Sequence, residues 1–176
     1  MPMRVSIGRT HGVSYYYLMK TIQFTDLSTE NKNLLEEAVG RLSHSLNKVT
    51  NPSTSVVAKG NNGYYFGNNI FLSNNTLICA EASALANAAA AGDHKISKLF
   101  LVISRTNATP KIVSPCGNCR QWLHDFSRLN DDRAIEVFCA TNELDQVIVT
   151  GSEELLPSGF KSAGLGRMVN EGKSGI

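Results

Sequence analysis

The sequence predicts an α/β fold in which helices cover both faces of one mixed sheet of five strands. Three observations lead to this prediction. The chain has 176 residues, which suits a single domain with its own core. Stretches with helical and strand-like spacing of apolar residues follow one another along it, and five have the pattern of strands. Helices separate the later strands, as in sheets that are covered on both sides.

The first predicted element is a helix over residues 28–46, where apolar side chains recur at helical spacing behind a Ser-Thr cap. Two strands follow, at 54–60 and 64–73, joined by an asparagine–glycine turn. Next comes an alanine-rich helix from about Cys79 to Ala91, which Gly92 ends. The remaining elements are a buried strand at 98–104, an extended piece at 111–113, a helix at 117–129, strands at 134–140 and 146–150, and a helical turn from residue 152.

Three segments are expected from the patterning: an N-terminal extension at 1–20 that is poorly ordered, a domain at 21–160, and a tail at 161–176. The domain segment holds 11 basic and 14 acidic residues and has no basic stripe that would gather phosphates, so no nucleic acid partner is expected. No apolar run approaches the roughly eighteen residues of a membrane span, and no convincing signal peptide is present. We therefore expect a cytoplasmic protein that does not bind membranes.

Three of the four cysteines lie where the two predicted helices begin. Cys79 opens the alanine-rich helix, and Cys116 and Cys119 are spaced so that their thiols share one face of the next helix. The partial positive charge of a helix N-terminus favours thiolate over thiol. Without a secretory signal, metal or redox chemistry is a better expectation than a disulfide framework. Cys139 lies within a strand and is interpreted as a core residue.

Three thiolates brought together would bind zinc and leave its fourth position open for water, which is the arrangement of a catalytic site. Glu81 lies in the first turn after Cys79, where its carboxylate could take a proton from that water. Arg120 follows Cys119 and could donate to a thiolate sulfur. Each half also has a simpler interpretation. The Cys-x-x-Cys pair could be a redox pair or half of a structural zinc site, and Cys79 could be a buried apolar residue.

The stretches TLICAEASALANAAAAGD and IVSPCGNCRQWL resemble the cytidine deaminase family, especially its small three-cysteine homotetrameric members and the related blasticidin S deaminases. The resemblance extends over roughly residues 28–160. It implies the three-layer α/β/α cytidine deaminase fold with a mixed five-stranded sheet. It also implies that Cys79, Cys116 and Cys119 hold Zn²⁺, with Glu81 as the catalytic proton shuttle. His124, on the second motif's helix, is then interpreted as structural or exposed rather than as a ligand.

The same resemblance implies the contacts to the substrate. The backbone at Ala80 would help to hold the water and the amino group of the base. Asn69, in GNNIF, would contact the sugar. Phe160, in ELLPSGF, would reach over a base bound in a neighbouring subunit, so that a homotetramer completes its active sites across subunits. Many relatives have an arginine where this chain has Ala82, which would leave Arg120 alone to pair with a thiolate.

Phe71 is a further departure from the family pattern, because cytidine deaminases usually have a ribose-binding glutamate at this position. The expected activity is hydrolytic deamination of a free cytosine nucleoside, cytidine or deoxycytidine, to uridine or deoxyuridine and ammonia, in pyrimidine salvage. The first alternative is a deaminase of a cytosine-nucleoside antibiotic such as blasticidin S, which Phe71 and LLPSGF favour. Two others are a nucleic-acid editing deaminase and a non-catalytic zinc or thiol module.

Overall fold

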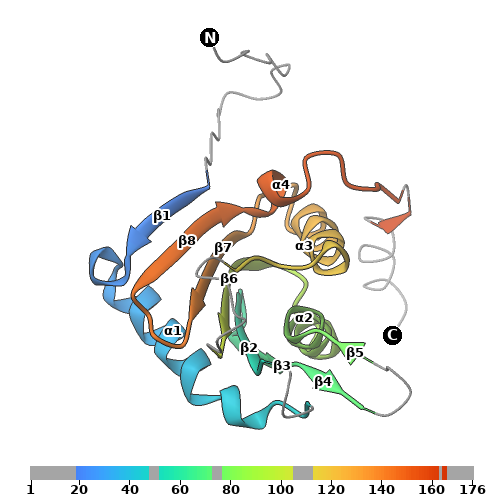
Figure 1. Ribbon diagram of the computed structural model, residues 1–176. Coiled ribbons are helices and arrows are strands. Elements are labelled where there is room, and N and C mark those ends of the chain that lie inside the picture. The colour runs from blue at the N-terminus through green and yellow to red at the C-terminus, as the bar shows by residue number, and fades with distance from the viewer. Residues whose placement is uncertain (1–18, 48–51, 73–76, 105–112, 163, 166–176) are drawn as a thin grey trace.

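The structure, a computed structural model, describes residues 19–47, 52–72, 77–104, 113–162 and 164–165. Its main sheet consists of β1 (Lys20–Gln23), β2 (Thr54–Gly60), β3 (Tyr64–Asn68), β6 (Ile96–Ile103), β7 (Glu136–Thr141) and β8 (Gln146–Gly151). The strand order is β1-β8-β7-β6-β2-β3 (Figure 1). Only β6 and β7 run parallel, and the other neighbours are antiparallel. The predicted mixed sheet is therefore confirmed.

The predicted count of five strands is one too few, because β1 adds a sixth. This strand pairs with β8 over four residues, from Lys20 opposite Val149 to Gln23 opposite Gln146. None of its side chains is buried. A short edge strand without an apolar face gives almost no strand signal in the sequence. Lys20, which the sequence assigned to the N-terminal extension, is the first residue of this strand.

Helices cover both faces of the main sheet (Figure 1). They are α1 (Thr29–Gly40), α2 (Ala80–Ala90), α3 (Gly117–Leu129) and α4 (Ser152–Leu155), with 3₁₀ turns at Phe24–Asp26 and Leu42–His44. The predicted first helix ends at Gly40, six residues early, and Ser28 is its N-terminal cap: its side chain accepts a hydrogen bond from the Asn31 amide. Gly92, with φ of +75°, follows α2 as expected.

Two hydrophobic clusters lie on opposite faces of the sheet, and the strands supply both. In β6, Leu99 and Leu101 belong to the cluster that includes α2 and α3, whereas Phe100 and Val102 belong to the cluster that includes α1. Successive side chains of a strand point to opposite faces, so a strand covered on both sides is apolar throughout. Cys139 is buried in the α2–α3 cluster, which confirms its interpretation as a core residue.

The strand predicted over residues 64–73 is divided at Asn69. β3 ends before this residue, and β4 (Ile70–Phe71) pairs with β5 (Leu77–Ile78) in a separate two-stranded sheet. The Asn69 side chain accepts a hydrogen bond from the Thr54 amide at 2.8 Å and donates to the Pro52 carbonyl at 3.2 Å. Side-chain bonds of this kind compete with the regular strand ladder. The break places β4 and β5 beside the N-terminus of α2 (Figure 1).

Several predictions concern residues outside the described ranges. They include most of the extension at 1–20, most of the tail at 161–176, residues 111–112 of the expected extended piece, and Ser73 at the end of a predicted strand. Within the described ranges, none of the helices is long and apolar enough to cross a membrane.

Candidate active site and metal centre

The sulfur atoms of Cys79, Cys116 and Cys119 meet at one point of the structure. The Sγ atoms of Cys79 and Cys116 are 3.7 Å apart, those of Cys116 and Cys119 are 3.5 Å apart, and all three lie within 4.8 Å of one another. A tetrahedral zinc with Zn–S bonds of about 2.3 Å would hold its sulfurs roughly 3.8 Å apart. The three thiols therefore fit a metal ion of this kind without rearrangement of the backbone.

Helix geometry brings these sulfurs together. Cys79 is the N-terminal cap of α2 and Cys116 that of α3, and Cys119 lies in the first turn of α3. The two helix N-termini thus meet at the cluster, and their partial positive charges favour thiolates there. Three thiolates around a divalent cation carry a net negative charge, which the helix ends partly offset.

The position of α2 depends on close contact with β3 at Gly67. A Cβ atom at this glycine would lie 2.3 Å from the Ala80 carbonyl oxygen and 2.3 Å from the Ala84 amide nitrogen. No side chain can be accommodated at such distances, because both atoms belong to the backbone of α2. Because Gly67 has no side chain, α2 can lie directly on the sheet. Cys79 and Glu81 are at the N-terminal end of this helix. α2 also contacts α3.

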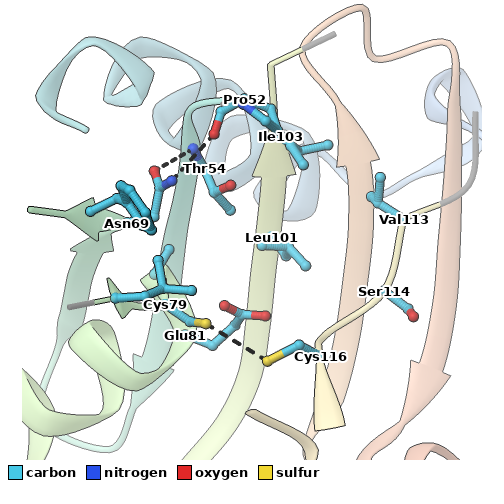
Figure 2. Close-up of a pocket in the computed structure, with 13 residues that line it drawn as sticks. Pro52, Thr54, Asn69, Cys79, Glu81, Leu101, Ile103, Val113, Ser114 and Cys116 are labelled. Atoms are coloured by element: carbon cyan, nitrogen blue, oxygen red, sulfur yellow. Dashed lines mark hydrogen bonds between the residues drawn. The ribbon is translucent and has the colours of Figure 1, made fainter. Parts of the chain in front are cut away.

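Glu81 is buried beside the cysteines, with 5% of its surface exposed. Figure 2 shows its carboxylate next to the sulfurs of Cys79 and Cys116 and directed into a cavity. A buried carboxylate without a salt bridge is costly, and such groups gather at functional sites. Because it is part of α2, its position relative to Cys79 is set by the helix.

The cavity has a volume of about 370 Å³, which lies in the range of small-molecule binding sites. Glu81, Cys79 and Cys116 form one end, and most of the wall is apolar (Figure 2). The lining residues are Pro52, Thr54, Asn69, Phe71, Leu77, Cys79, Ala80, Glu81, Leu101, Ile103, Val113, Ser114 and Cys116.

The cavity includes residues that the sequence did not single out. Pro52 lies just before β2 and Thr54 begins it, Leu101 and Ile103 belong to β6, and Ser114 lies in the segment before α3. They carry no motif, and strand pairing brings them to the cavity from distant parts of the chain. Thr54 could have been suspected as a polar residue opening an otherwise apolar strand.

Burial has the largest influence on the pKa values of Glu81 and the three clustered cysteines. It raises the pKa of the Glu81 carboxyl, against hydrogen bonds from its own backbone and from Cys119. Burial, together with the Cys116 hydrogen bond and the Glu81 charge, raises the pKa of Cys79 to about 11. Burial and the Glu81 charge likewise raise the pKa of Cys119. At Cys116, burial also opposes ionisation, but hydrogen bonds from Cys119 and Cys79 outweigh it and lower the pKa. A bound divalent cation would remove this conflict, because coordination deprotonates thiols.

The predicted substrate contacts lie around the same cavity, with one exception. Asn69, Phe71 and Ala80 all line it. The amide of Asn69 is fixed by its two backbone hydrogen bonds, and Ala80 is buried in the first turn of α2. Phe160 does not line the cavity of its own chain, and 74% of its surface is exposed.

Arg120 holds the segment before α3. Its Nε donates to the Pro115 carbonyl at 2.8 Å, and its Nη2 donates to the Ser114 hydroxyl at 3.0 Å. The predicted donation to a thiolate sulfur is not among these contacts and stays a prediction. His124 is buried on α3 and is not part of the cysteine cluster, which agrees with its interpretation as a structural residue.

Comparisons with known proteins agree with this geometry. The family model for the cytidine and deoxycytidylate deaminase zinc-binding region matches residues 28–130. A cytidine deaminase from Mycoplasma genitalium is 36% identical over 104 residues, which cover 58% of this chain and 74% of that protein.

Solved structures show the same fold. The structure of a cytidine deaminase from Burkholderia pseudomallei superposes with a TM-score of 0.64 at 25% identity, over 76% of this chain and all of that one. A Mycobacterium leprae cytidine deaminase gives a TM-score of 0.58 at 22% identity, over 74% of this chain and all of that one. The predicted cytidine deaminase-like α/β fold is thereby confirmed, with six main-sheet strands here in place of the expected five.

Proposed function

The chain belongs to the cytidine and deoxycytidylate deaminase zinc-binding family, and we propose that it hydrolyses the 4-amino group of a free cytosine nucleoside, releasing ammonia. The observation that carries this proposal is the joint geometry of Glu81 and the three clustered cysteines, which we call the cavity floor. Three sulfurs spaced for one tetrahedral ion adjoin a buried carboxylate, at the end of a cavity of nucleoside size. A non-catalytic zinc module would have no need of the cavity or of buried Glu81.

We assign Zn²⁺ to Cys79, Cys116 and Cys119, because a set of three thiolates with short spacings suits zinc better than harder metals. When bound, zinc supplies a Lewis acid that makes water ionise near neutral pH. Glu81 would then act as the general acid–base: it takes the two protons of the attacking water in turn, gives the first to N3 of the base and the second to the departing amine, and the water oxygen stays on C4 as the carbonyl oxygen. Burial, which raises the pKa of this carboxyl, suits a group that must hold and release protons.

The walls of the cavity would position the base. Leu101, Ile103 and Val113 form apolar parts of the cavity wall, which would exclude bulk water from a flat ring. Ala80 would offer its backbone to the reacting end of the base. Asn69, whose amide is held by Pro52 and Thr54, keeps one N–H and one lone pair for the sugar. Its fixed orientation would make it a specific contact.

The proposal includes an assembly of four subunits in which Phe160 reaches the cavity of a neighbour. It is supported by the exposure of this side chain, which is unusual for a phenylalanine, and by the exposed apolar residues beside the cavity. Leu46, Leu72, Leu77 and Ile78 are all exposed in the single chain. A cytoplasmic location is also part of the proposal, because three free thiols stay reduced there. Sedimentation of the purified protein tests the assembly.

A second candidate substrate is a cytosine-nucleoside antibiotic such as blasticidin S. Phe71 favours it, because a phenylalanine in the cavity wall cannot accept a hydrogen bond from a ribose hydroxyl. Both candidates share the cytosine ring and the same chemistry, so the floor of the cavity does not distinguish them.

The test is a panel of cytidine, deoxycytidine, cytosine and blasticidin S, followed by the loss of absorbance at the cytosine band. Zinc content is measured on the same sample. We expect about one zinc per chain and turnover of at least one cytosine nucleoside. Turnover of blasticidin S alone would select the second candidate. Single-stranded DNA and RNA serve as negative controls, and no turnover of any panel member would refute the proposed function.

A further inference from the structure

Helix α3 holds the main chain of the exposed Phe160 through the side chain of Gln121. The Gln121 side chain makes two hydrogen bonds to the main chain of Phe160: its Oε1 accepts from the amide at 3.1 Å, and its Nε2 donates to the carbonyl at 2.9 Å. The same Nε2 donates to Asp125 Oδ1 at 3.0 Å. Asp125 therefore fixes which end of the Gln121 amide faces which backbone group.

The residue before Phe160 is held against the same helix. A Cβ atom at Gly159 would lie 2.7 Å from the ring carbons Cδ2 and Cγ of His124. The ring of His124 is 7% exposed, and its two nitrogens make no hydrogen bond within the part of the chain that the structure describes. His124 thus contacts the segment through ring packing, whereas Gln121 supplies the directional bonds.

The contrast between the main chain and the side chain of Phe160 needs an explanation. An exposed phenylalanine outside any helix or strand normally has no reason to be held by two directed hydrogen bonds. Here the backbone is held and the ring projects from the chain with 74% of its surface exposed. Such an arrangement fixes the direction of an aromatic ring before the ring meets a binding partner. This preorganisation lowers the entropic cost of the later contact.

We propose that Gln121 is a positioning residue that aims the Phe160 ring at the base bound in a neighbouring subunit. This inference rests on the proposed function, because it presupposes that Phe160 completes a substrate site. Gln121 lies two residues after Cys119, so one helix sets both the metal ligands and the aromatic ring that it presents to the next subunit. Gln121 itself touches neither metal nor base and acts through Phe160.

The first experiment measures the position of Phe160 without any activity. Gln121→Met keeps the length of the side chain and removes both hydrogen bonds. We expect amide hydrogen exchange at Phe160 to become roughly three- to tenfold faster, as the loss of a bond of ordinary strength implies. The Leu156 amide, which donates to the Ser152 carbonyl, should exchange as in wild type. Gln146→Met makes the same chemical change at an exposed position of β8 and should alter neither amide.

The second experiment is a double-mutant cycle on the substrate that the panel identifies. We expect Phe160→Ala to raise KM by about tenfold to a hundredfold, as the loss of one base–aromatic contact implies. Gln121→Met should raise KM by roughly threefold to tenfold with kcat within about twofold, and should have no further effect in the Phe160→Ala background. Zinc content and sedimentation should match wild type in Gln121→Met.

Two results would overturn the inference. One is unchanged exchange at Phe160 in Gln121→Met. The other is an additive cycle, in which Gln121→Met raises KM equally with and without Phe160, because the glutamine would then act on general stability or directly on the substrate. If the wild-type protein deaminates no cytosine nucleoside, the proposed function fails by itself, and the exchange measurement still decides whether Gln121 holds Phe160.

Discussion

The floor and the rim of the cavity are built on different principles. The floor consists of Cys79, Glu81, Cys116 and Cys119, all on the first turns or caps of α2 and α3. The rim consists of β4, β5 and, in the proposed assembly, Phe160 of a neighbour. Glu81 and Cys119 are buried, whereas Leu77, Ile78 and Phe160 are exposed. In the proposed function, the local geometry of two helix ends would fix the chemistry, and an exposed surface would decide the choice of substrate.

The largest effect should come from the floor. Cys119 is fully buried, and Cys119→Ala removes one of the three proposed zinc ligands, for which the cluster has no substitute within the described residues. We expect zinc to fall well below one per chain and turnover to drop by more than about a thousandfold, measured on a sample purified without added metal. Cys139→Ala is the matched control, since it removes a buried cysteine outside the cluster and should retain zinc and turnover.

A smaller but still severe effect should follow from displacing the floor residues while their side chains stay the same. Gly67→Ala would place a methyl group 2.3 Å from backbone atoms of α2, so the helix must shift with Cys79 and Glu81. Overpacking of this kind costs about 1–3 kcal/mol, visible as a lower melting temperature, and we expect weaker zinc retention in a chelator titration. Gly40→Ala in α1 has open space around its Cβ and should leave zinc binding unchanged. Equal behaviour of the two variants would contradict the close contact.

The smallest effect should come from the rim. Phe71→Glu would restore a hydrogen-bond acceptor for a ribose hydroxyl at the cavity wall. We expect KM for cytidine to fall by roughly three- to tenfold, with kcat within about twofold, in steady-state kinetics. The same variant should give no gain with 2′,3′-dideoxycytidine, which lacks the hydroxyls. If kcat changed as much as KM, the separation of floor and rim would not hold.

The sequence predicted the floor well because its parts are local. Cys116 and Cys119 are spaced i, i+3, so spacing alone places their thiols on one side of α3, and Glu81 follows the capping Cys79 in the first turn of α2. The layers were also predictable, since the apolar run of β6 requires cover on both faces.

Other features depend on contacts between distant segments, and the sequence did not reveal them. β1 exists because β8 offers an edge, and β3 ends because Asn69 bonds to the backbone of Pro52 and Thr54. The hydrogen bonds of Arg120 to Ser114 and Pro115 likewise arise from the folded loop. No periodicity or motif records such pairings.

In the proposed mechanism, Glu81 would carry protons beside a zinc ion that the three cysteines hold. Glu81→Gln keeps the size of the side chain and removes its ability to accept and deliver protons. We predict that this variant retains about one zinc per chain while kcat falls by roughly a hundredfold to ten-thousandfold, measured on one preparation by metal analysis and by loss of the cytosine absorbance. Full turnover in zinc-loaded Glu81→Gln would contradict the account, as would loss of zinc together with activity.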